Sequence, residues 1–145
     1  MSLRAVFFGS PAFAVPCLRA LAGAAGVEVR AAVSQPDRPA GRGQAPTPPA
    51  VKREAEALGI PVLQFEKVRT PETAAALEAL NADLFVVVAY GRILPQALLD
   101  LPRLGPALMR ELAAQVEAIR AVAGEALRIL SDDDLRPRYV AHLPA

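Results

Sequence analysis

Short, almost uninterrupted apolar runs alternate with helical segments along the first part of this chain. The apolar runs are residues 3–8 (LRAVFF), 27–33 (VEVRAAV), 60–63 and 84–88 (LFVVV), and the intervening segments predict helices over 12–24, 50–58 and 71–80. Apolar runs of this length are typical of strands buried on both faces, and strand–helix alternation favours a parallel sheet. The sequence therefore predicts an α/β domain: a Rossmann-like open parallel sheet with helices on both faces.

Local signals set the ends of these elements. Thr70 is a suitable N-cap for the third helix, and Glu72 lies in its first turn, where it complements the helix dipole. Gly59 and Asn81 suit the left-handed position that follows a helix. We expect residues 84–88 to be the most buried strand, and Cys17 to be a buried small hydrophobic residue.

Composition excludes several classes of protein. The net charge of +1 gives no global attraction to nucleic acid or membranes, so any basic site must be local. A single cysteine excludes an internal disulfide and a cysteine-based metal cluster, and we predict no metal site. No apolar stretch is long enough for a transmembrane helix, no signal peptide is evident, and we expect a cytoplasmic protein without membrane partners. No G-x-G-x-x-G motif occurs, so a nicotinamide cofactor is not expected.

A proline- and glycine-rich segment covers residues 34–49, and its composition predicts irregular structure. Gly41 and Gly43 flank Arg42 and would let it project, while Arg38 lies nearer the start of the loop. Two arginines on a stiff arm suit phosphate contact, because each guanidinium presents a planar fork of donors. A solvated loop with incidental charges is the alternative.

Two further turns follow predicted strands at the sheet edge where ligands bind in open α/β folds. Gly9-Ser10-Pro11 opens the first helix, whose unpaired backbone N–H groups favour an anion, and a simple tight turn explains the motif equally well. The segment from Tyr90 to Leu94 could present apolar walls and free backbone groups to a flat heterocycle.

These segments together resemble the methionyl-tRNA formyltransferases. The matching motifs, in order, are FGSPxFAVP (8–16), SQPDRPAGRG (34–43), PAVK (49–52), GIPV (59–62), DxxVVVAYG (83–91) and ILP (93–95). The resemblance covers about residues 1–105 and identifies them as the N-terminal part of such a domain. It leaves residues 106–145 as a helical tail of no recognised family.

The resemblance implies formyl transfer from 10-formyltetrahydrofolate to the amine of initiator methionyl-tRNA. It assigns tRNA contact to Arg38 and Arg42 in the loop. Folate contact is assigned to Tyr90, Gly91, Arg92, Ile93 and Leu94. The family's loop usually continues with lysines, whereas Gln44 and Ala45 follow here, which predicts fewer phosphate contacts.

The family's Asn-x-His motif and its later catalytic aspartate have no counterpart in this sequence. Asn81 is the only asparagine and His142 the only histidine, so the two cannot form the motif. His142 is the one remaining candidate for an acid–base role, although an ordinary tail residue is the favoured interpretation. We therefore predict a truncated chain that is not catalytic alone. It would be either a folate- or tRNA-binding module or a product without activity of its own.

Apolar residues at helical spacing predict one long amphipathic helix over residues 106–130. Its apolar stripe must be buried, either on this chain's own sheet or on a second copy. A homodimer through this helix is our expectation.

Overall fold

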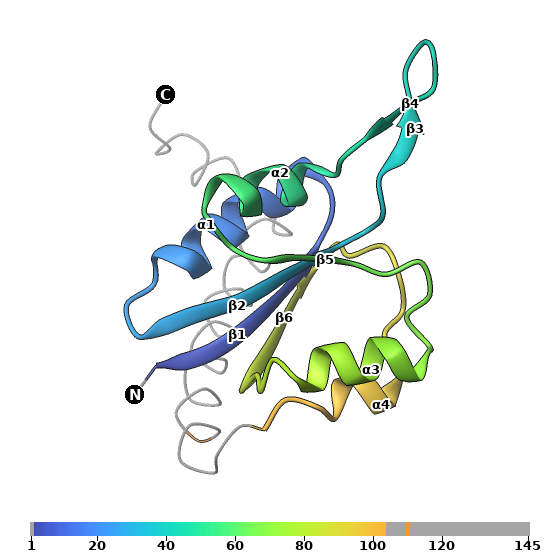
Figure 1. Cartoon of the computed structure of the whole chain (residues 1–145). Helices are drawn as coiled ribbons and strands as arrows, with labels where there is room; N and C mark the ends of the chain where they lie inside the picture. Colours follow the sequence, from blue (N-terminus) through green and yellow to red (C-terminus); the bar gives the residue numbers. More distant parts are fainter. Residues whose placement is uncertain (1, 104–109, 111–145) are drawn as a thin grey trace, which may run out of the picture. The chain divides into compact units, whose positions relative to one another are not determined.

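Four short apolar segments form a parallel sheet with the strand order β5-β2-β1-β6. The computed structural model describes residues 2–103 and residue 110, and all four strands lie within this part. The strands are β1 (Leu3–Gly9), β2 (Val27–Ser34), β5 (Val62–Gln64) and β6 (Leu84–Val88). The predicted open parallel sheet is confirmed (Figure 1).

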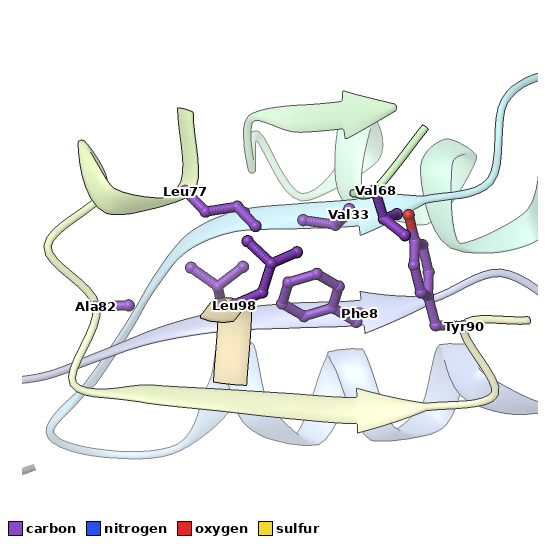
Figure 2. Packing of buried hydrophobic residues seen from close by; sticks show 8 residues of the cluster. Phe8, Val33, Val68, Leu77, Ala82, Tyr90 and Leu98 are labelled. Atoms are coloured by element: carbon purple, nitrogen blue, oxygen red, sulfur yellow. The ribbon is translucent and has the colours of Figure 1, made fainter. Parts of the chain in front are cut away.

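Helices cover both faces of this sheet, as predicted (Figure 1). The helices are α1 (Val15–Gly23), α2 (Ala50–Ala57), α3 (Pro71–Glu78) and the short α4 (Gln96–Leu99), which the sequence analysis did not predict. Phe7 of β1 packs with α1 and α2 on one face. Its neighbour Phe8 points to the other face, towards α3 and α4 (Figure 2). The alternation of side chains along β1 thus divides the core into two clusters.

Several predicted helix ends are confirmed. The Thr70 hydroxyl accepts a hydrogen bond from the Thr73 backbone N–H at 3.2 Å, which caps α3. Gly59 and Asn81 adopt left-handed φ values of 71° and 47° after α2 and α3. The first helix begins with a 3-10 turn at Ala12–Ala14 before α1.

The prediction of irregular structure for residues 34–49 is wrong. The segment contains an antiparallel hairpin of β3 (Arg38–Ala40) and β4 (Ala45–Thr47), whose partners include Pro39 and Pro46. Proline is tolerated because a two-stranded ribbon consists of two edges, and an edge N–H need not donate to a ladder. Positive φ values at Gly41, Gly43 and Gln44 close the turn.

Two burial predictions are also wrong. Leu84–Val88 is not the most buried strand, because it lies at the edge of the sheet formed by the described residues. β1, which is enclosed between β2 and β6, is buried from residue 5 to residue 9. Cys17 is exposed, since Leu18 is the buried residue of α1. The strand predicted over residues 60–63 is observed two residues later, at Val62–Gln64.

Several predictions fall outside the described residues. They are the helix over 106–130 (apart from residue 110), His142 and the change of character at Gly105. None of the described helices is both long and apolar enough to span a membrane.

Candidate functional site

A cleft of about 530 Å³ lies at the carboxyl ends of β1, β2 and β6. Three segments that are far apart in the sequence line it: the turn after β1, the base of the β3–β4 hairpin and the turn after β6. Its lining includes Ser10, Pro11, Gln35, Arg38, Pro49, Tyr90 and Gly91. The carboxyl edge of a parallel sheet is where open α/β folds bind ligands.

Gly9 allows the first of these turns to approach β6. A Cβ built at Gly9 would lie 2.7 Å from the Phe7 ring and 2.9 Å from the carbonyl oxygen of Val88. Any larger residue would push the ends of β1 and β6 apart. Glycine at this position is therefore required by packing.

Ser10 and Gln35 connect the three segments by hydrogen bonds. The Ser10 hydroxyl donates to the carbonyl oxygen of Tyr90 at 3.0 Å and accepts from the Gln35 backbone N–H at 3.1 Å. The Gln35 side-chain amide donates to the same Tyr90 oxygen at 3.1 Å. The turn after β6 is thus fixed by both other segments.

Arg92 extends this network. Its Nε donates to Gln35 Oε1 at 2.9 Å, and a second guanidinium N–H donates to the carbonyl oxygen of Glu66. Gln35 therefore uses both ends of its amide, one towards Tyr90 and the other towards Arg92. The guanidinium of Arg92 is engaged within the protein.

A second set of contacts anchors the base of the hairpin. Asp37 accepts hydrogen bonds from Lys52 Nζ at 2.9 Å and from Gln64 Nε2 at 2.6 Å. These bonds hold the pKa of Asp37 below its ordinary value, and the bond from Gln64 has the largest effect. Asp37 is therefore a carboxylate at neutral pH, and it ties the hairpin to α2 and β5.

The five residues assigned to folate do not all face the cleft. The Tyr90 side chain is buried in the core against Phe8, so only its backbone lies at the surface (Figure 2). Leu94 packs against the same core cluster. Gly91 lines the cleft with a φ of 88°, whereas Ile93 is not among the lining residues and is 80% exposed.

The Tyr90 hydroxyl has no hydrogen-bond partner among the described residues. Burial raises the pKa of Tyr90, and the positive charge of Arg92 offsets part of this rise. The phenol is therefore neutral at physiological pH and contributes chiefly through packing.

The two arginines assigned to tRNA occupy different parts of the hairpin. Arg38 lines the cleft at the hairpin base, with a guanidinium nitrogen 4.0 Å from a Glu66 carboxylate oxygen. Arg42 is exposed at the tip, between Gly41 and Gly43. The hairpin projects away from the sheet, so both side chains are accessible (Figure 1).

The connecting roles of Gln35, Gln64 and Lys52 were not predicted from the sequence. Gln35 lies within the SQPD motif, which was the available signal, but nothing in its sequence neighbourhood indicates a contact 55 residues away. Within residues 2–103, no three His, Cys, Asp or Glu side chains gather in a way that could hold a metal ion.

Comparisons with known proteins agree with this fold. Residues 3–108 match the family described as formyl transferase. The methionyl-tRNA formyltransferase of Sorangium cellulosum is 58% identical over 103 residues, which are 71% of this chain and 32% of that protein. That of Citrifermentans bemidjiense is 56% identical with the same coverage. The chain thus spans about a third of the length of these relatives.

A solved structure supports the fold alone. Glycinamide ribonucleotide transformylase 1 from Symbiobacterium toebii superposes with a TM-score of 0.51 at 17% identity, covering 70% of this chain and 48% of that one. The family match spans β1 to β6 together with all three segments that line the cleft. This chain belongs to the formyl transferase family.

Proposed function

We propose that this chain binds both substrates of methionyl-tRNA formylation in one cleft and does not transfer the formyl group on its own. The observation that supports this proposal is that the base of the hairpin and the turn after β6 line the same cleft. The first is the segment that the family resemblance assigns to tRNA, and the second is the one it assigns to folate. Formyl transfer needs donor and acceptor side by side, because proximity supplies a large part of the rate.

The turn after β6 suits 10-formyltetrahydrofolate. Ile93 offers an exposed apolar side chain to a flat heterocycle, and Gly91 has no side chain to obstruct the adjacent backbone. Arg92 supports the turn through Gln35. We therefore assign direct contact to Ile93 and to the backbone of Tyr90 and Gly91, and a supporting role to Arg92 and Leu94. Bound folate would supply the formyl group.

The hairpin suits the phosphates of initiator methionyl-tRNA. Arg38 and Arg42 are exposed on a narrow ribbon, and the ion pair between Asp37 and Lys52 holds the base of that ribbon. A preorganised arm loses less entropy when it binds than a flexible loop would. With one arginine at its base, one at its tip and no lysine in the turn, the arm should bind moderately and with a modest dependence on salt.

The chemistry of transfer needs groups that the part of the chain described by the structure does not place at the cleft. Attack of an amine on the formyl carbon produces a tetrahedral oxyanion, which needs a strong hydrogen-bond donor, and the proton must then move between the nitrogens. Asn81 precedes β6, whereas the cleft lies at the other end of that strand. His142 is the only histidine. We therefore propose binding without turnover by the chain alone; a family fold without binding is the alternative.

Two expectations accompany this proposal. We expect the chain to act in the cytoplasm, where initiator tRNA is formylated, and to form a homodimer through the helix predicted over residues 106–130. Sedimentation at several protein concentrations tests the dimer, and a monomer mass at all of them would contradict it.

Calorimetric titration of the full chain with a stable 10-formyltetrahydrofolate analogue tests the function. We expect micromolar affinity, and Ile93→Asp should abolish binding because it places a charge against the heterocycle. Leu58→Asp is the matched control: Leu58 is 44% exposed, and it lies at the end of α2 away from the cleft. No binding at millimolar analogue would contradict the donor assignment. Formyl transfer by the chain alone would contradict the claim that it is not catalytic.

A further inference from the structure

Glu66 lies between the two regions proposed to bind the formyl donor and its acceptor. Its backbone carbonyl accepts a hydrogen bond from the guanidinium of Arg92, in the turn after β6. Its carboxylate lies 4.0 Å from a guanidinium nitrogen of Arg38, at the base of the hairpin. Glu66 belongs to the connection between β5 and α3, which lies outside the family motifs of the sequence. This residue is therefore placed to act on both regions.

The backbone around Glu66 is held on both sides. Phe65 and Val68 pack against the same core cluster, and Val68 is only 9% exposed. The carbonyl oxygen of Lys67 accepts a hydrogen bond of 2.8 Å from the Thr73 hydroxyl, in the first turn of α3. These contacts fix the main chain, so that only the Glu66 side chain can move. Its carboxylate therefore stays near the base of the hairpin.

The contact between Glu66 and Arg38 is weak enough for another anion to replace it. The two side chains are 73% and 61% exposed, and 4.0 Å is too long for a hydrogen bond. Ion pairs exposed to water stabilise a protein little. Asp37 at the same hairpin base differs, because it accepts close bonds from Lys52 and Gln64 and is less exposed. Asp37 is thus part of the framework, whereas Glu66 can yield to a ligand.

We propose that the Glu66 carboxylate competes with RNA phosphate for Arg38, and so limits the affinity of the hairpin for RNA. This rests on the proposed function. Carboxylate and phosphate oxygens both match the planar fork of a guanidinium, so the two anions use the same donors. A phosphate bound to Arg38 must displace Glu66 and remain near its negative charge. Arg42 has no carboxylate within ion-pair distance among the described residues, so its phosphate contact should lack this competition.

Fluorescence anisotropy of an acceptor-stem RNA with the full chain tests this competition. Glu66→Gln removes the charge and keeps the shape, so we expect about three- to fivefold tighter binding at low salt. The slope of log K against log salt should become steeper by up to about 0.7–0.9, because Arg38 then acts as a full cation. Glu66→Ala removes the same charge and should give the same gain. The gain should persist in an Arg42→Ala background and disappear in an Arg38→Ala background.

Glu78→Gln is the matched control, since it removes an exposed carboxylate at the last residue of α3, away from the cleft. Equal gains in Glu66→Gln and Glu78→Gln would overturn the inference, because net charge would then explain both. A gain that survives Arg38→Ala would overturn it as well.

The same titrations separate this inference from the proposed function. If the wild type binds RNA and neither Glu66 variant binds more tightly, the inference alone fails. If the wild type does not bind and Glu66→Gln gains binding through Arg38, the inference stands while the acceptor half of the proposed function fails. If none of the proteins binds RNA, both fail. Folate binding is measured without RNA, so the donor half is judged independently.

Discussion

The side-chain amide of Gln35 donates a hydrogen bond of 3.1 Å to the carbonyl oxygen of Tyr90, and so joins the strand that enters the hairpin to the turn that follows β6. The same amide accepts from Arg92 through its oxygen. One side chain thereby connects the proposed acceptor arm with the proposed donor turn. The two regions should not respond independently to substitution at this residue.

Gln35→Ala should lower the affinity for the folate analogue by about 30-fold, since two hydrogen bonds worth about 1 kcal/mol each are lost. Gln35→Glu keeps an acceptor for Arg92 but loses the donor to Tyr90, so its affinity should lie between those of wild type and Gln35→Ala. Gln44→Ala is the control, because Gln44 lies at the exposed hairpin tip. Calorimetry on all four proteins decides. Equal affinities of Gln35→Ala and Gln44→Ala would show that the turn holds without this contact.

Gly9→Ala should destabilise the protein by about 1–3 kcal/mol, because the added methyl must displace the Phe7 ring or the backbone of β6. Gly23→Ala offers the matched control, since a Cβ at Gly23 meets nothing within 4 Å and alanine favours helix. Urea unfolding measures both. Similar midpoints for the two variants would refute the packing requirement at Gly9.

Arg42→Ala should weaken binding of an acceptor-stem RNA and reduce the slope of log K against log salt by about 0.7–0.9, as loss of one phosphate contact requires. Arg69→Ala removes the same charge from an exposed position before α3 and should leave the slope unchanged. Fluorescence anisotropy at several salt concentrations provides the slopes. A slope that does not change in Arg42→Ala would exclude phosphate contact at the tip.

Asp83 should make the free energy of unfolding depend on pH. Its carboxylate accepts three hydrogen bonds from Arg4: from the backbone N–H at 2.8 Å, from Nε at 3.0 Å and from the NH2 group at 2.8 Å. These bonds lower the pKa of Asp83, and the side-chain bonds have a larger effect than the backbone bond. Because the pKa of Asp83 is lower in the folded state, its ionised form stabilises the fold. This stabilisation is complete when the pH is above the pKa of the unfolded state, near 3.8, and is lost as the pH falls through the pKa of the folded state.

Asp83→Asn should therefore lower Tm by roughly 4 °C at neutral pH. The difference from wild type should shrink when the pH drops below about 4. Glu56→Gln, at an exposed position of α2, is the control. Thermal melts from pH 7 to pH 2.5 test this, and a difference that is constant over the whole range would contradict it.

Tyr90→Phe should raise the free energy of unfolding by about 1 kcal/mol, because it removes a buried hydroxyl that has no partner among the described residues. The raised pKa of Tyr90 adds a second effect. Wild-type stability should fall as pH rises above 10, where the unfolded phenol ionises, and the variant should lack this part of the loss. A less stable Tyr90→Phe would mean that the hydroxyl has a partner beyond those residues.

Much of the secondary structure could be predicted from interactions between residues close together in the sequence. The Thr70 cap, the left-handed Gly59 and Asn81, and the strand at residues 3–8 depend on contacts within a few residues, so the sequence alone predicted them. The hairpin in residues 34–49 was missed because proline and glycine indicate irregular structure unless the pairing partner is known.

Burial could not be predicted in the same way. The LFVVV run at residues 84–88 is more apolar than β1, yet it is less buried because it is an edge strand among the described residues. Cys17 has apolar neighbours in sequence but lies on the outer side of α1.

By itself the sequence determined the α/β class, the family and the three segments that carry the family's motifs. Secondary-structure propensities and motifs depend on residues that are neighbours in the sequence, so no tertiary contact is needed to recognise them. The tertiary structure decided which of these segments share a cleft. It directed the Tyr90 side chain into the core and left Ile93 exposed, and it gave Gln35 its central position. These outcomes depend on strand order and on contacts between residues 25 to 80 positions apart, and no local pattern encodes such distances.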